Sequence, residues 1–247
     1  MKPPASWART LTVALGIASM TAWGASSAEP GPDMPPSGSL NVLGPVPAFE
    51  PNALPLDWMS QGKIERGQLA VVEKAGIPAL RVINGKNQFV TAKPTQASLL
   101  ATPYLSWSWN MEPPESGVHP VRLVIGLQGK DAAPSGWGSL TSAGPGNTLP
   151  PHDRAIVILW GSSALQRGSI AKPETIDSKQ TAARYTARGG SENTGSWWFE
   201  TVDLSDIYRR TWPQDKIETA RIMFIGIAAA GGKAPSPAYI SGLRLSR

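Results

Sequence analysis

Apolar and polar residues alternate along much of this chain with the period of a β-strand. Leu105, Trp107, Trp109 and Met111 fall on one face of residues 105–111, and two serines and an asparagine fall on the other. This period of two predicts a half-buried strand. Short segments rich in β-branched or aromatic residues predict further strands at residues 69–73, 79–83, 88–92, 121–127, 197–199 and 239–245. Of these, the strands at 69–73 and 79–83 flank Gly76-Ile77-Pro78 and are expected to form a hairpin.

Two segments, 155–160 and 222–227, are apolar almost throughout and predict central strands that are covered on both faces. One helix is expected near 203–212, because Asp203 can cap its start and Pro213 stops it. Many short strands, glycine and proline turns and a single short helix predict an all-β fold. We expect an antiparallel β-sandwich of the jelly-roll type.

The first 53 residues have a different composition. Lys2 and Arg9 precede an apolar stretch at 11–22, and small residues follow at 26–28, so residues 1–28 are predicted to be a signal peptide that is cleaved after Ala28. The protein is then periplasmic or secreted, with no stable membrane span after signal removal. Residues 29–53 form a proline-rich linker, and residues 54–247 form the β-sandwich domain.

Composition excludes several kinds of chemistry. The 25 glycines and 24 prolines argue against a helix-rich or coiled-coil protein. The absence of cysteine excludes a thiol nucleophile, disulfides and a cysteine-based zinc site. The net charge of +5 falls to +3 without Lys2 and Arg9, and the remaining basic residues are scattered. This charge gives no indication of a nucleic-acid partner.

Catalytic and cofactor signatures are weak. The two histidines, His119 and His152, have no G-x-S-x-G motif to accompany them, so a serine hydrolase is not expected. No converging metal-ligand pattern and no phosphate or dinucleotide fingerprint occurs. We therefore predict no catalytic residue, no metal site and no cofactor.

Tryptophan suggests a binding function. Ten tryptophans occur, eight of them after residue 28. Their rings stack on the apolar faces of sugars, and their N–H groups reach hydroxyls. Trp107 and Trp109 share a face with apolar residues and are expected in the core. Trp137, in a glycine-rich loop at 131–153, and Trp160, at a strand end, are the candidate ligand-binding tryptophans.

Two charged residues are further candidates for ligand binding. Arg122 projects from the face opposite Val121 and Leu123, and a half-buried arginine needs an acidic partner. Glu200 lies within a predicted strand and is the expected partner; the alternative is a purely structural ion pair. The loops at 131–153 and 162–183 are either binding loops or tolerated insertions.

Several segments together resemble a known family: 105–109, 121–124, 158–160, 200–210 and 222–227. They are similar to a group of exported bacterial proteins that are classified as a domain of unknown function. The resemblance covers about residues 54–247 and implies a galactose-binding-like jelly roll, with Trp107, Trp109, Arg122 and Trp160 matching the pattern. The chain differs at Ser108, at His119-Pro120 and at 228–232, where the family usually carries charged residues, so it resembles a divergent member.

Three hypotheses follow for the function. The first is an exported, non-catalytic β-sandwich that binds a glycan or a similar polar ligand of the cell envelope. The second is a glycan-active hydrolase that uses Glu200 with a second carboxylate. The third is a structural or assembly protein of the cell envelope. The sequence does not determine the oligomeric state.

Overall fold

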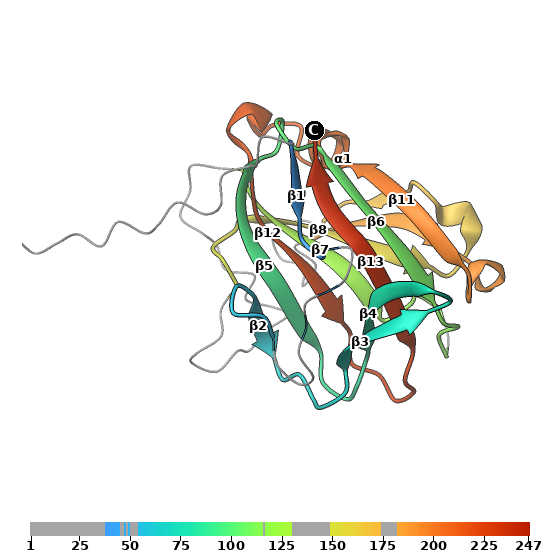
Figure 1. Ribbon diagram of the computed structural model, residues 1–247. Coiled ribbons are helices and arrows are strands. Elements are labelled where there is room, and N and C mark those ends of the chain that lie inside the picture. Colours follow the sequence, from blue (N-terminus) through green and yellow to red (C-terminus); the bar gives the residue numbers. More distant parts are fainter. Residues whose placement is uncertain are drawn as a thin grey trace, which may run out of the picture.

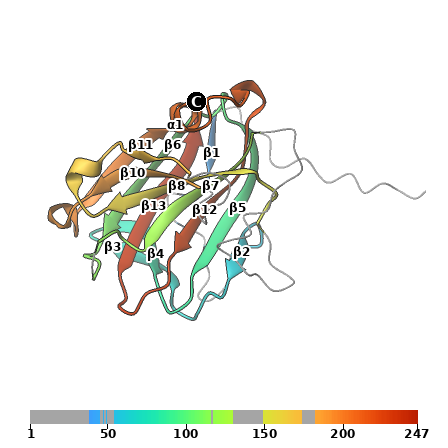
Figure 2. The ribbon, with the colours of Figure 1, turned by 180° about the vertical axis from the view of Figure 1, so that it is seen from behind.

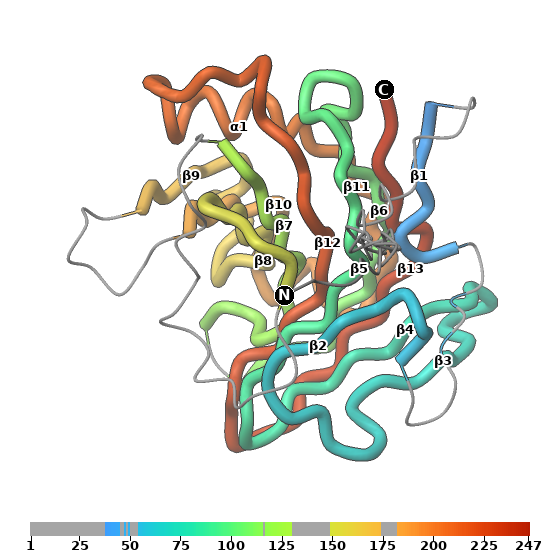
Figure 3. The backbone as a smooth tube through the Cα atoms, turned by 90° about the vertical axis from the view of Figure 1, so that its left-hand side faces the viewer, coloured from blue at the N-terminus to red at the C-terminus, as the bar shows by residue number. Residues whose placement is uncertain are grey.

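The computed structural model describes residues 38–44, 47, 49, 54–115, 117–129, 149–173 and 182–247. Two β-sheets pack face to face in this part of the chain (Figure 1). Figure 2 shows the molecule from behind, with the second sheet towards the viewer. Figure 3 shows the two layers from the side, with the first sheet on the right. The prediction of an all-β sandwich with one short helix is confirmed.

Six described strands form the first sheet: β1 (Ser39–Asn41), β3 (Leu69–Lys74), β4 (Ile77–Ile83), β6 (Tyr104–Met111), β11 (Trp197–Asp203) and β13 (Pro237–Ser246). The order is β11-β6-β13-β4-β3, and β1 pairs with β13. All described pairs in this sheet are antiparallel. β1 lies within the range for which the composition predicts a linker.

Seven described strands form the second sheet: β2 (Met59–Gly62), β5 (Phe89–Ser98), β7 (Val121–Gln128), β8 (Arg154–Gly161), β9 (Ile170–Ala171), β10 (Ala183–Gly189) and β12 (Arg221–Ala229). Their order is β2-β5-β12-β7-β8-β10-β9. One pair, β8 with β10, is parallel, and the other described pairs are antiparallel. A parallel pair needs a long connection, and residues 162–182 provide it.

Two details of the strand prediction are wrong. The β3–β4 hairpin turns at Ala75 and Gly76, whose φ angles of 50° and 78° suit a two-residue turn with positive φ at both positions. Ile77 and Pro78, expected in the turn, belong to β4. The segment 162–183, expected as a loop, contributes β9 and leads into β10. Arginine and threonine side chains occupy one face of β10, so its sequence shows no apolar run.

The core between the sheets is built around tryptophan. Trp107 and Trp109, on the inner face of β6, are fully buried, as predicted. Their rings meet edge to face with centroids 5.2 Å apart, and Trp109 meets Trp160 of β8 in the same manner at 5.6 Å. Trp109 and Trp160 belong to opposite sheets, so this contact joins the two layers. Such pairs contribute about 0.5–1.5 kcal/mol beyond the area that they bury.

The single described α-helix, α1 (Leu204–Thr211), begins where the sequence predicts. Oδ1 of Asp203 accepts hydrogen bonds from the backbone N–H groups of Ser205 and Asp206 at 2.8 and 3.1 Å. Tyr208 is buried on the inner side of the helix and donates its hydroxyl to Asp215, which also pairs with Arg154 of β8 at 2.9 Å. This network ties the helix to the second sheet.

The start of β7 depends on a neutral histidine. His119 is fully buried, and its Nδ1 accepts the backbone N–H of Val121 at 3.1 Å. Burial lowers the pKa of His119 from 6.5 to about 4. Between pH 6.5 and pH 4 the histidine of the unfolded chain binds a proton that the folded chain does not. The stabilisation that neutral His119 gives the fold is therefore fully present above pH 6.5, and it is lost as the pH falls towards 4.

We therefore predict that acidification from pH 7 to pH 4 costs the wild type about 3 kcal/mol more of its unfolding free energy than it costs the variant His119→Asn. Asparagine retains an acceptor near Nδ1 and does not titrate in this range. Urea unfolding at a series of pH values measures the difference. Identical pH profiles for the two proteins would show that His119 does not contribute in this way.

Candidate functional site

Glu200, a predicted ligand-binding residue, is held in a buried ion-pair network. Its side chain projects from the inner face of β11 and is 4% exposed. Oε1 accepts from Nε of Arg188 on β10 at 2.5 Å, and Oε2 accepts from Nη2 of Arg167 at 3.2 Å. The predicted partnership with Arg122 is wrong: the carboxylate joins an edge strand of the first sheet to β10 of the second.

Trp160, a predicted ligand-binding tryptophan, lies on the core face of β8 and is 1% exposed. Its Nε1 donates to the backbone carbonyl of Gly190 at 3.3 Å. The ring therefore packs in the sandwich, and only its margin reaches a surface pocket. Trp137, the other predicted tryptophan, lies outside the described residues.

Arg122 projects from the outer face of the second sheet and lines a pocket of about 240 Å³. We call it the arginine pocket. Leu159 of β8 lies opposite Arg122 in the sheet and forms part of the pocket floor. The described residues that line it are Val118, Arg122, Leu159, Gln166, Ser169, Ala171, Arg184 and Thr186.

A second pocket of about 270 Å³ lies beside the first, and we call it the tryptophan pocket. Their lining residues are neighbours: Gly117 of one precedes Val118 of the other, and Ser162 Oγ of one donates to Gln166 Oε1 of the other at 3.3 Å. The tryptophan pocket is lined by Pro113, Pro114, Gly117, Trp160, Gly161, Ser162, Gly190 and Ser191.

Glycines at the ends of β8 and β10 allow the close packing that shapes this region. A Cβ on Gly161 would lie 2.6 Å from Gln166 Oε1 and 2.8 Å from Thr186 Cγ2. A Cβ on Gly189 would lie 2.6 Å from the carbonyl oxygens of Gly161 and Ser163. Without side chains here, the 3-10 turn Ala164–Gln166 packs against β10 and places Gln166 in the lining of the arginine pocket.

The electrostatic character of the two pockets differs. Arg122 and Arg184 both line the arginine pocket, whereas none of the described residues that line the tryptophan pocket is charged. Burial lowers the pKa of Arg122, and the neighbouring charge of Arg184 lowers it further. No aspartate, glutamate or histidine is among the described residues that line either pocket.

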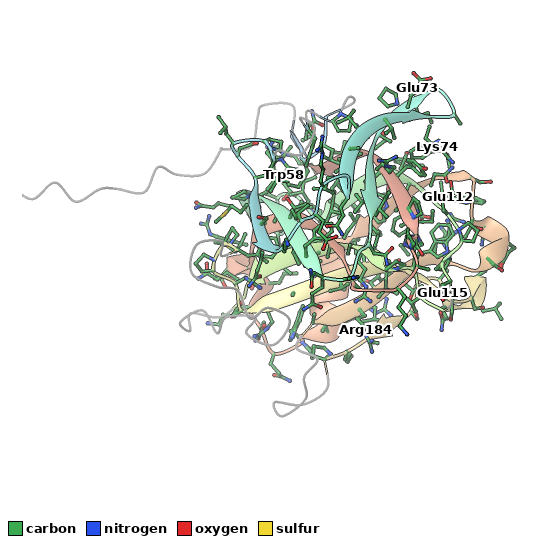
Figure 4. The ribbon with its side chains drawn as sticks, turned by 90° about the horizontal axis from the view of Figure 1, so that it is seen from below. Trp58, Glu73, Lys74, Glu112, Glu115 and Arg184 are labelled. Atoms are coloured by element: carbon green, nitrogen blue, oxygen red, sulfur yellow. The ribbon has the colours of Figure 1, made fainter. Side chains whose placement is uncertain are left out.

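Two further carboxylates have partners within the fold and are not among the described residues that line either pocket. Glu112 forms an ion pair with Lys74 at 2.6 Å, and Asp203 caps α1. Figure 4 shows Glu112 and Lys74 on the right of the view from below, and Arg184 at the bottom on the second sheet. Within the described ranges, no group of three or more acids and histidines could hold a metal ion. No helix in the same ranges is long and apolar enough to cross a membrane.

Sequence reasoning finds Arg122 but misses the residues that complete its pocket. Arg184 and Thr186 alternate with Ala183 and Tyr185, which is the period of a strand, and this alternation could have identified β10. Gln166 carries no comparable signal, because its position depends on the turn after β8.

Comparison with known proteins gives no family. No family model matches the chain, and no curated protein does. Membership of the exported family therefore stays a prediction.

Some solved structures show a distant likeness. A family 11 carbohydrate-binding module from Clostridium thermocellum, in complex with a mixed-linked tetrasaccharide, aligns at 9% identity and a TM-score of 0.37 over 85% of this chain and 95% of the module. A family 12 xyloglucanase from Bacillus licheniformis aligns at 8% identity and a TM-score of 0.38 over 84% of this chain and 99% of the enzyme. Likenesses at this level transfer neither a ligand nor a site to this chain.

The buried network around Glu200 leads to a stability prediction. We expect Glu200→Gln to lower the unfolding free energy by about 3 kcal/mol, because the variant leaves the Arg188 guanidinium buried without a full counter-charge. Arg188 is 11% exposed and also stacks over Trp198, with its guanidinium carbon 3.8 Å from the ring centroid. Urea unfolding at pH 7 measures the loss.

The matched control is Asp206→Asn, which removes a carboxylate from an exposed ion pair with Arg210 on α1. Exposed pairs contribute little, so this change should cost no more than about 1 kcal/mol. If both variants lost the same stability, the Glu200 network would not have the structural role assigned to it.

Proposed function

We propose that this protein is an exported, non-catalytic β-sandwich that binds a carbohydrate or a similar polar ligand. The arginine and tryptophan pockets form the binding site. Export is supported by the predicted signal peptide at 1–28 and by the resemblance to an exported family. The binding role is supported by the lining of two adjoining pockets.

The observation that carries this proposal is the lining of the two pockets. Both combine groups that bind hydroxyls with apolar surface, and their described lining residues include no acid and no histidine. Gln166, Ser169 and Thr186 offer amide and hydroxyl groups in one pocket, and Ser162 and Ser191 offer hydroxyls in the other. Val118 and Leu159 add apolar surface for the C–H face of a sugar ring.

The size of the pockets suits small units of a larger ligand. Volumes of 240 and 270 Å³ are below the roughly 300–1,000 Å³ of sites for drug-sized molecules. Each pocket therefore accommodates about one sugar ring. Because Ser162 of one pocket contacts Gln166 of the other, we propose that one oligosaccharide reaches both.

The hydrolase hypothesis has less support from this geometry. Glycoside hydrolysis needs two carboxylates on either side of the scissile bond. Glu200 is buried between two arginines, and no carboxylate lines either pocket among the described residues. A role as a structural or assembly protein of the cell envelope remains the alternative in which no glycan binds.

The test is a broad glycan array followed by calorimetry on the best ligand. We expect binding without turnover, and we expect Ser191→Trp to weaken the affinity at least tenfold because the indole would fill the tryptophan pocket. Ser196→Trp is the matched control, since Ser196 is exposed in the turn before β11 and lines neither pocket. It should bind as the wild type does.

Two outcomes would overturn the proposal. If the folded protein bound no glycan on the array, carbohydrate binding would be refuted, and the role as a structural or assembly protein would be favoured. Release of new reducing ends from the bound glycan, abolished by Glu200→Gln in a folded variant, would favour the hydrolase.

A further inference from the structure

Two arginines line one pocket of the second sheet and form no ion pair with a carboxylate of the described residues. Arg122 lies opposite Leu159 in the sheet, and Thr186 of β10 lies opposite Leu159 on its other side. Arg184 is two residues before Thr186 on β10, so its side chain emerges on the same outer face. Both arginines line the arginine pocket.

Three other arginines in this half of the molecule have a carboxylate partner. Arg154 pairs with Asp215, and both Arg167 and Arg188 pair with Glu200. By contrast, no described carboxylate forms an ion pair with Arg122 or Arg184. The Nε of Arg122 is buried and has no hydrogen-bond partner among the described residues.

This arrangement is unfavourable in the free protein. A half-buried guanidinium without a counter-ion loses hydration, and a second positive charge in the same pocket adds repulsion. An anion placed between the two arginines supplies the missing counter-charge and relieves the repulsion. The pocket therefore favours a negatively charged ligand group.

The remaining lining selects among anions. Val118, Leu159 and Ala171 are apolar, and Ser169 Oγ donates to Thr186 Oγ1 at 3.3 Å, which lets the Thr186 hydroxyl donate in turn to a ligand. A bare inorganic ion would leave the apolar surface uncovered. A sugar ring that carries its own carboxylate covers that surface and presents a planar group to the guanidinium forks.

We propose that the arginine pocket binds the carboxylate of a uronic acid residue, so that the protein recognises acidic rather than neutral glycans. This proposal rests on the carbohydrate-binding function proposed above and names its ligand class. The nearby tryptophan pocket, whose described lining residues are all uncharged, then receives a neighbouring sugar of the same chain.

The test compares two matched probes by calorimetry: a disaccharide that contains glucuronic acid, and the same disaccharide with its carboxylate reduced to the alcohol. We expect the acidic probe to bind at least tenfold more tightly, with an affinity that falls as salt is raised. Arg184→Gln, at an exposed position, should remove this preference. Arg244→Gln, at an exposed position of the first sheet, should leave it unchanged.

Arg122→Gln provides a second readout that separates a ligand-binding role from a structural one. An arginine that supports the fold would lower the melting temperature of the free protein when replaced. An unpaired arginine kept for the ligand should raise or preserve the melting temperature while binding of the acidic probe is lost.

Three results would overturn the inference. Equal affinity for the acidic and reduced probes would refute the uronic acid while leaving carbohydrate binding intact. If the protein bound neither probe but bound neutral glycans on the array, the uronic acid would again be refuted and carbohydrate binding would stand. Inorganic phosphate or sulfate that competed at the same concentration as the acidic disaccharide would identify a simple anion site.

Discussion

The contact between Trp109 and Trp160 is the interaction on which the rest of the molecule depends. It is where the inner faces of the two sheets meet through their largest side chains, both almost fully buried. The same Trp160 donates its Nε1 to Gly190, which lines the tryptophan pocket. The residue that joins the layers therefore also fixes the pocket wall, and a looser core would displace the binding surface.

Charge is distributed in two opposite ways around this core. At Glu200, one buried carboxylate is shared by two arginines and closes the sandwich between β11 and β10. On the outer face of the second sheet, Arg184 and Arg122 line a pocket, and no carboxylate among the described residues pairs with either of them. The first arrangement gives its buried charges a partner, whereas in the second the proposed uronic acid would supply the missing counter-charge. Binding sites commonly contain groups whose charges are not balanced until the ligand binds, at a local loss of stability.

The parts of the structure that could be predicted from sequence are those set by local pattern. The alternation at Trp107 and Trp109 identifies β6 and its core face, and Asp203 identifies the start of α1. Alternation also places Arg122 on the face opposite its apolar neighbours. It does not say which strand lies beside that face, so the partnership of Arg122 with Glu200 could not be settled from spacing.

Trp160 shows a further reason why the site was only partly predictable. Its position at a strand end is compatible with exposure or burial, and burial depends on the opposite sheet, where Trp109 meets it. The number of tryptophans therefore reports on the core as much as on binding. The residues that line the arginine pocket are mostly small, polar or charged, and single residues of these types are frequent on any surface.

The position of the pocket follows from the one parallel pair in the second sheet. Because β8 and β10 run in the same direction, the chain must return from the end of β8 to the start of β10. The first part of this return segment carries Gln166, Ser169 and Ala171. It lies beside β10, because β9 pairs with that strand. An antiparallel pair joined by a tight turn would have left Arg122 on an open face. The return segment instead encloses it with Arg184, and a topological requirement thereby produces a confined cationic site.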